Sequence, residues 1–228
     1  MVGTKKILAV IAARGGSKGL PGKNVAPCGG RPMIEWTLAA AKGSSLIDKT
    51  IVSSDDPAIH EAARKAGVEV PFVRPAHLAT DEASMQSVIE HAVQEAGDGA
   101  EVCVLLQVTS PLRRAEDIDA AIRLYERTGG PSMVGMTPVT KPPYWMYSLG
   151  EGDRVKPLFP ELNGAFRRQE LPKTYVPNGA IYVFDLKWFF EKRLFITEES
   201  VAFIMPAERS VDVDTAIDLA LADILLRS

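Results

Sequence analysis

The chain reads Ile7-Leu-Ala-Val-Ile-Ala-Ala13 and continues without a break as Arg14-Gly-Gly-Ser-Lys-Gly-Leu-Pro-Gly-Lys-Asn24. The apolar run is typical of a buried strand, and the apolar periodicity of residues 32–42 predicts a helix after the loop. Glycine lets backbone N–H groups approach a ligand closely, and the lysines and the arginine add positive charge. A strand, a cationic glycine loop and a helix N-terminus in this order predict a site for a polyphosphate.

The positive charge of this loop is local. The first 34 residues carry six basic side chains and no acidic one, whereas the whole chain has a formal net charge of −3. A general nucleic-acid binder would be basic overall, so the sequence argues against a nucleic-acid partner. A plain turn rich in glycine and lysine is the simpler alternative, and the order strand, loop, helix favours the phosphate site over it.

Composition places the chain among globular proteins with one sizeable core. Of its 228 residues, 46% are hydrophobic and 24% are charged, which is ordinary for such a protein. The two cysteines, Cys28 and Cys103, have no CxxC spacing, so neither a disulfide framework nor a structural zinc site is expected. An 18-residue apolar stretch and a signal-peptide cleavage pattern are both absent from the sequence, and we expect a cytoplasmic protein with no membrane partner.

Strand-like and helix-like segments alternate along most of the chain. Expected strands cover residues 7–13, 49–54, 68–73, 102–108, 132–136, 179–184 and 201–205, and expected helices cover 32–42, 57–66, 84–96, 116–127 and 214–226. Repeated strand–helix units predict an α/β fold with a mainly parallel sheet and helices on both faces.

The alternation of strand-like and helix-like segments stops between Pro138 and Pro177. This stretch contains seven prolines, scattered aromatic residues and mixed charge, with no long periodic segment. It is too long for a simple loop in a compact domain, which indicates a functional or partner-facing element.

Four polar segments are expected to meet at one edge of the sheet, because ligands of doubly wound sheets lie beyond the carboxyl ends of the strands. They are the glycine loop, Ser53-Ser-Asp55, Gln107-Val-Thr-Ser-Pro111 and Asp212-Val-Asp214. In an extended segment, Asp212 and Asp214 point the same way, so both carboxylates could bind one Mg²⁺. The alternative for Asp214 is an N-cap of the last helix, and both roles remain open for this residue.

The loop does not match the common nucleotide-binding patterns. Gly22-Lys23 is followed by Asn24, and Ser17 stands where a P-loop needs its first glycine. The sequence also lacks the GxGxxG fingerprint of dinucleotide-binding folds.

Five segments, in order, resemble the N-acylneuraminate cytidylyltransferases, also called CMP-sialic acid synthetases. They are Ala13–Asn24; Arg74-Pro with Leu78-Ala-Thr-Asp81; Leu106-Gln-Val-Thr-Ser-Pro-Leu-Arg113; Arg168-Gln-Glu-Leu-Pro172 with Pro177-Asn-Gly-Ala-Ile-Tyr182; and Val211-Asp-Val-Asp-Thr215. The resemblance spans nearly the whole chain. It implies a single three-layer, Rossmann-like nucleotidyltransferase domain, with residues 140–176 as a small protruding dimerisation element.

The resemblance also implies the reaction: CMP passes from CTP to the anomeric hydroxyl of a nonulosonic sugar acid, and pyrophosphate is released. By similarity, the CTP phosphates are held by Arg14, Ser17, Lys18 and Lys23, and the nucleoside by Asn24, Arg74 and the backbone near Ser84. The sugar acid is met by Gln107, Asn178, Tyr182 and Phe195, and by Lys141 and Arg168 reaching across a homodimer. Asp212 and Asp214 hold Mg²⁺ and, with Arg14 and Lys23, form the expected catalytic set. The base that deprotonates the sugar hydroxyl is either Asp212 or a metal-bound hydroxide.

Two positions separate this chain from the related Kdo cytidylyltransferases, which carry Arg and Pro where Gly19 and Asn24 stand here. The nonulosonate branch is therefore favoured, while Val176 and Ile196 leave the identity of the sugar open. The rival functions are a Kdo-type enzyme, a sugar-1-phosphate nucleotidyltransferase on the same fold, and a nucleotide-binding regulatory protein without turnover. The acidic pair favours an enzyme over a regulator, and the absence of a Gly-Thr-Arg loop argues against the sugar-1-phosphate class.

Overall fold

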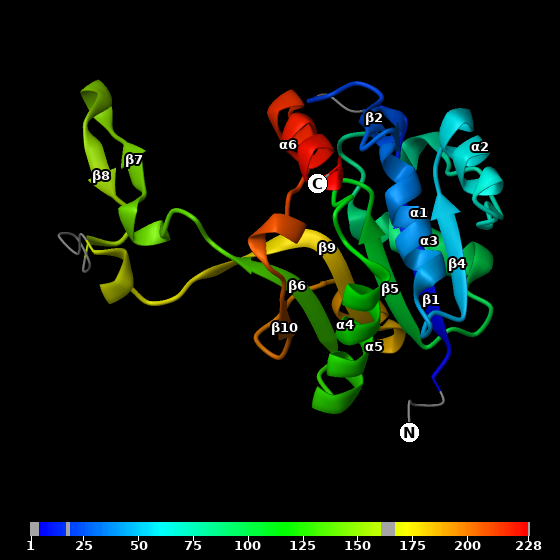
Figure 1. Ribbon diagram of the computed structural model, residues 1–228. Helices are drawn as coiled ribbons and strands as arrows, with labels where there is room; N and C mark the ends of the chain where they lie inside the picture. Colours follow the sequence, from blue (N-terminus) through cyan, green and yellow to red (C-terminus); the bar gives the residue numbers. More distant parts are fainter. Residues whose placement is uncertain (1–4, 17–18, 161–166, 228) are drawn as a thin grey trace.

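A single six-stranded sheet organises the molecule (Figure 1). The computed structural model describes residues 5–16, 19–160 and 167–227. The strand order is β10-β6-β9-β5-β1-β4, in which β9 alone runs antiparallel to its neighbours β5 and β6. The predicted α/β fold with a mainly parallel sheet is confirmed.

The elements of the body follow the expected alternation. The sheet strands are β1 (Ile7–Ala12), β4 (Lys49–Ser53), β5 (Val102–Gln107), β6 (Ser132–Pro138), β9 (Tyr175–Asp185) and β10 (Val201–Ile204). The helices are α1 (Met33–Gly43), α2 (Pro57–Lys65), α3 (Met85–Ala96), α4 (Ala115–Thr128), α5 (Leu186–Lys192) and α6 (Ala216–Arg227). A short hairpin, β2 (Pro27–Cys28) and β3 (Arg31–Pro32), lies between the glycine loop and α1.

The alternation of side chains in β1 produces the three layers, because successive residues of a strand face opposite sides of the sheet. Ile7, Ala9 and Ile11 belong to the core beneath α1, α2 and α4, whereas Leu8 and Val10 belong to the core beneath α3 and α5. Both faces are buried, which explains why the strand reads as a continuous apolar run.

Two expectations about the elements were wrong. Residues 68–73 do not form a strand, because only Glu69 makes a bridge, to Ile51 in β4. Helix α5 was not predicted: β9 runs directly into it, and the carboxylate of Asp185 caps it by accepting a hydrogen bond from the backbone N–H of Trp188, 3.0 Å away.

An arm leaves the body between β6 and β9. The two strands continue to pair as far as Pro138 and Tyr175, and beyond them the chain forms a hairpin of β7 (Tyr147–Leu149) and β8 (Val155–Pro157). This hairpin lies well apart from the sheet (Figure 1). The arm overlaps the element predicted at residues 140–176, except at its end, where Tyr175 and Val176 pair with β6 and belong to the sheet.

The cysteines are placed as expected, since Cys28 and Cys103 are both buried and unpaired with each other. Burial raises the pKa of each thiol, most strongly that of Cys103. No helix within the described ranges is long and apolar enough to cross a membrane.

Candidate active site

A cleft of about 410 Å³ opens beyond the carboxyl ends of β1 and β5. Its lining draws on four distant parts of the chain: Ala12, Ala13, Arg14, Lys23 and Asn24; Arg74, Leu78, Thr80, Asp81, Ala83, Met85 and Val88; Gln107, Val108 and Thr109; and Asp212 and Asp214. Three of the four segments expected to converge supply lining residues, and the fourth, after β4, supports Arg74. The cleft lies at the edge of the sheet where these segments were predicted to converge.

The glycines of the loop allow it to lie against two other loops. The backbone N–H of Gly15 donates to the carboxylate of Asp55 (3.0 Å), and a Cβ on Gly15 would fall 2.5 Å from Oδ2 of Asp56. A Cβ on Gly19 would fall 2.9 Å from the carbonyl oxygen of Asp214. Larger residues at these two positions would push the loop out of the cleft.

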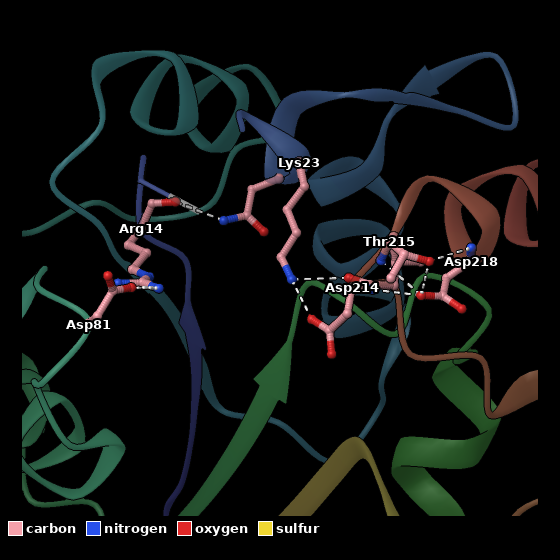
Figure 2. A network of polar contacts seen from close by, with 8 residues as sticks. Arg14, Lys23, Asp81, Asp214, Thr215 and Asp218 are labelled. Atoms are coloured by element: carbon pink, nitrogen blue, oxygen red, sulfur yellow. Dashed lines mark hydrogen bonds and ion pairs between the residues drawn. The ribbon is translucent and has the colours of Figure 1, made fainter. Parts of the chain in front are cut away.

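Lys23 joins the glycine loop to the acidic segment (Figure 2). Its ammonium donates to Oδ1 of Asp214 (2.7 Å) and to the carbonyl oxygen of Val213 (3.0 Å). The Lys23 side chain is only 13% exposed, whereas that of Asp214 is 70% exposed. The lysine is thus held in the cleft wall with its charge directed at the acidic pair.

The N-cap interpretation of Asp214 was wrong. Helix α6 is capped one residue later, where Oγ1 of Thr215 accepts from the N–H of Asp218 (3.3 Å) and Oδ2 of Asp218 accepts from the N–H of Thr215 (2.8 Å). This reciprocal arrangement is a capping box. It leaves the Asp214 carboxylate with Lys23 and available to a ligand (Figure 2).

Asp212 lies in the same cleft with an altered acidity. Desolvation raises its pKa above the ordinary value, and the negative charge of Asp214 adds to the rise. A hydrogen bond with Thr109 and the charge of Lys23 act in the opposite direction. Because the charge of Asp214 disfavours a second negative charge on Asp212, a cation bound between the two carboxylates would stabilise this site.

Arg14 is paired across the cleft with a residue that sequence reasoning did not single out. Its guanidinium lies 2.5 Å from Oδ1 of Asp81, and the two side chains face each other in Figure 2. Asn24 is buried, and its amide donates to the carbonyl oxygen of Arg14 (2.8 Å). Asp81 is the last residue of the segment Leu78-Ala-Thr-Asp81, which the resemblance already included. Because the glycine loop carries bases and no acid, an acidic residue in another cleft segment was a candidate partner for Arg14.

Arg74 forms part of the inner wall of the cleft. It is 4% exposed, and its guanidinium donates from Nε to Oγ of Ser53 (3.0 Å) and from Nη2 to the carbonyl oxygen of the same residue. Burial lowers the pKa of Arg74 to about 10. Ser84 lies beside the cleft as the N-cap of α3, accepting from the N–H of Ser87 (3.1 Å).

The residues predicted to meet the sugar divide into two groups. Gln107 lines the cleft, and Tyr182 lies near Asp212, whose charge adds to burial in raising the pKa of the Tyr182 hydroxyl. Phe195 lies against Tyr182, with ring centroids 5.8 Å apart. Asn178 differs from the prediction: it is 3% exposed and does not line the cleft, because its amide is used inside the protein.

The Asn178 side chain links β9 to the segment of Ser210. Its Nδ2 donates to Oγ of Ser210 (3.0 Å), and its Oδ1 accepts from the N–H of Ala180 (3.1 Å). The geometry therefore assigns Asn178 to the support of the site rather than to its surface.

The remaining predicted residues lie elsewhere. Lys141 is exposed at the base of the arm, away from this cleft. Ser17 and Lys18 lie outside the described residues, and so does the side chain of Arg168, whose backbone belongs to the short helix Arg168–Glu170. Within the described ranges, no three His, Cys, Asp or Glu side chains gather into a group that could hold a metal ion alone.

Comparisons with known proteins agree with this geometry. Residues 8–142 match the sequence family described as Cytidylyltransferase. The chain is 36% identical over 227 residues to the CMP-N,N'-diacetyllegionaminic acid synthase of Legionella pneumophila, covering 97% of this chain and 96% of that protein. It is 35% identical over 215 residues to the N-acylneuraminate cytidylyltransferase of Streptococcus agalactiae, covering 93% of this chain and 51% of the relative, so it spans about half of that longer protein.

A solved structure shares the fold. The structure of CMP:2-keto-3-deoxy-manno-octonic acid synthetase complexed with CTP has a TM-score of 0.71, with 19% sequence identity, and the match covers 97% of this chain and 98% of the other. At that identity the likeness establishes the architecture, and the sequence relatives establish the membership. On these sequence matches the chain belongs to the cytidylyltransferase family.

Proposed function

We propose that the protein transfers CMP from CTP to the anomeric hydroxyl of a nonulosonic sugar acid and releases pyrophosphate. The observation that carries the proposal is a single cleft whose lining combines the bases Arg14, Lys23 and Arg74 with the acidic pair Asp212 and Asp214, and in which Lys23 bonds to Asp214. The names of the relatives, which refer to legionaminic and N-acylneuraminic acids, support this acceptor class.

The reaction needs charge neutralisation more than covalent chemistry. The anomeric oxygen bonds to the α-phosphorus, the bond from that phosphorus to the β-phosphate oxygen breaks, and the hydroxyl proton passes to a base. Lys23 and Arg14 would bind the triphosphate and stabilise the departing pyrophosphate. Arg74, fixed by Ser53, would border the nucleoside.

Asp212 is our candidate for the group that receives the hydroxyl proton. Burial and the charge of Asp214 raise its pKa, which increases its affinity for a proton. Thr109 fixes its orientation, and Tyr182 lies close by on the side where we place the acceptor.

The acidic pair also fits a Mg²⁺ ion. Asp212 and Asp214 are hard oxygen donors in one cleft, and Mg²⁺ commonly binds through one or two carboxylates plus substrate phosphates. The Lys23 ammonium already occupies a cation's position beside Asp214. When bound, the ion would supply charge neutralisation to the phosphates of CTP. The chain's own part would be to hold it with Asp212 and Asp214 and to release the Lys23 ammonium toward the phosphates.

We further propose that the enzyme is a homodimer built on the arm. Large apolar side chains are exposed there, including Leu149 (71%) and Val155 (66%) on the hairpin, and Tyr147 beside them. Aromatic and aliphatic residues of this kind are typical of interface cores. In a dimer of this type Lys141 and Arg168 would reach the acceptor of the neighbouring subunit, and a CTP-dependent enzyme would act in the cytoplasm.

The test is a substrate matrix. The protein is incubated with each of the four nucleoside triphosphates and with a panel of 2-keto sugar acids and sugar 1-phosphates, and pyrophosphate is measured. We expect pyrophosphate only with CTP and a free nonulosonic acid. Turnover with Kdo alone or with a sugar 1-phosphate alone would replace this proposal, and binding of CTP without any turnover would favour a regulatory protein.

A further inference from the structure

Strands β5 and β9 separate beside the acceptor side of the cleft. Their antiparallel pairing runs from Val102 and Asp185 to Leu105 and Tyr182, and ends there. On its other edge, β9 bulges: residues 178–181 lie opposite the single residue Gly135 of β6. The backbone pairing of β9 with β5 therefore stops before Gln107, the last residue of β5.

Arg113 spans this separation. Its side chain is 3% exposed, and Nη1 donates both to the carbonyl oxygen of Gln107 (3.1 Å) and to that of Ala180 (2.7 Å). One guanidinium nitrogen therefore joins the two strands where their backbone pairing has ended. Nε and Nη2 are buried and make no hydrogen bond within the described part of the chain.

A buried guanidinium costs free energy, because the charged group loses its contact with water. Burial lowers the pKa of Arg113 to about 9, against the opposing charge of Asp117. The Asp117 carboxylate is bonded to Arg209, at 3.0 and 3.1 Å. Asp117 is the carboxylate whose charge acts on Arg113, yet it is paired with Arg209. Burying Arg113 without a carboxylate of its own lowers stability, and this cost indicates that Arg113 serves the neighbouring site.

The two carbonyls that Arg113 holds belong to the framework of the acceptor side. Gly179, in the bulge, has φ of 72°, and a Cβ there would fall 2.8 Å from Oε1 of Gln107. The framework continues to the acidic segment, because the N–H of Val213 donates to the carbonyl oxygen of Thr109 (2.8 Å). A shift of the bulge would thus move Gln107 first and the segment of Asp212 next.

We infer that Arg113 is a positioning residue for the acceptor: it sets the spacing between Gln107 and the β9 bulge, and through that spacing the pocket for the sugar acid. The inference rests on the proposed function. The nucleotide side lies across the cleft, where Lys23 and Arg14 are held by contacts that do not include Arg113.

The experiment compares Arg113→Met, which removes the donor and the charge, with Arg113→Lys, whose ammonium keeps both. We expect Arg113→Met to raise the KM for the sugar acid about tenfold or more while the KM for CTP changes less than about threefold, since small displacements of positioning groups have effects of this size. Arg113→Lys should recover most of the loss. Arg113→Gln, which keeps one donor, replaces Arg113→Met if that variant does not fold.

Asp119→Ala is the matched control, because it breaks the buried hydrogen bonds of Asp119 to Ser44 and Ser45, outside the cleft lining. This variant should lose stability without separating the two KM values. Equal changes in both KM values in the Arg113 variants, no change in either, or no rescue by lysine would overturn the inference. Absence of turnover by the unmodified protein would overturn the proposed function and this inference with it, whereas an active protein with unseparated KM values overturns the inference alone.

Discussion

Replacing Lys23 by alanine separates catalysis from stability. The ammonium makes two polar contacts, with Asp214 and with the carbonyl oxygen of Val213. Its acidic partner is 70% exposed, so solvent screens the pair and the loss of folding free energy should stay near 1 kcal/mol. In the reaction the same charge meets the phosphates in the cleft, where removing one preorganised cation costs about 2–4 kcal/mol of transition-state stabilisation.

That energy corresponds to a loss of roughly 30- to 900-fold in kcat/KM. The assay is pyrophosphate release under varied CTP, with thermal unfolding measured on the same samples. Lys42→Ala is the matched control, because Lys42 also donates to a backbone carbonyl, that of Ala66, outside the cleft. It should leave kcat/KM unchanged.

A second readout comes from pH. Lys23 lowers the pKa of Asp212, so its removal should raise that pKa and move the acidic limb of the activity profile to higher pH. Near-normal turnover of Lys23→Ala at saturating CTP would remove Lys23 from the catalytic set. A large loss of melting temperature together with the loss of activity would show that the lysine acts mainly on the fold.

Four further predictions concern the same machinery. Asp214→Asn should abolish most turnover with little change in melting temperature, whereas Thr215→Ala should cost about 1 kcal/mol of stability through the lost cap with activity retained. In the unmodified protein, activity should fall as pH drops through the raised pKa of Asp212, so the acidic limb should lie above the ordinary aspartate value of about 3.9. Arg168→Ala and Lys23→Ala, each inactive alone, should recover activity on mixing if Arg168 serves the partner's site; no recovery despite proven subunit exchange would exclude a shared site. Both buried thiols should resist a thiol reagent in the native protein and react in denaturant, which free reaction under native conditions would contradict.

Local patterns were sufficient to predict most of the fold. The continuous apolar run of β1 and the proline at the start of α2 act over a few residues, and the structure repeats them closely. The failures have long-range causes. Residues 68–73 have a strand-like composition, but their pairing with β4 is limited to one bridge, between Glu69 and Ile51. Helix α5 follows β9 without a loop, so no turn signal marks its start.

In the site, too, local patterns predicted the position of the segments, whereas long-range contacts decide the role of each side chain. The segments that line the cleft were identifiable because strand ends meet at one edge of a sheet. What each side chain does there depends on partners far along the chain: Asp214 faces Lys23 rather than its own helix, and Asn178 bonds to Ser210. Arg113 reads in the sequence as one more base in a polar segment. Its role becomes visible only when Gln107 and Ala180 are seen on either side of it.

If the protein transfers CMP from CTP to a free sugar acid, the product must contain one phosphate between nucleoside and sugar. Analysis of the products therefore tests the proposed function most directly. The protein is incubated with CTP, Mg²⁺ and a nonulosonic acid. The products are identified by mass spectrometry, and the released pyrophosphate is quantified in the same samples. We predict one CMP-linked sugar, with one phosphate between nucleoside and sugar, for each pyrophosphate released. A diphosphate-linked sugar formed from a sugar 1-phosphate, or CMP and pyrophosphate with no sugar adduct, would contradict the account.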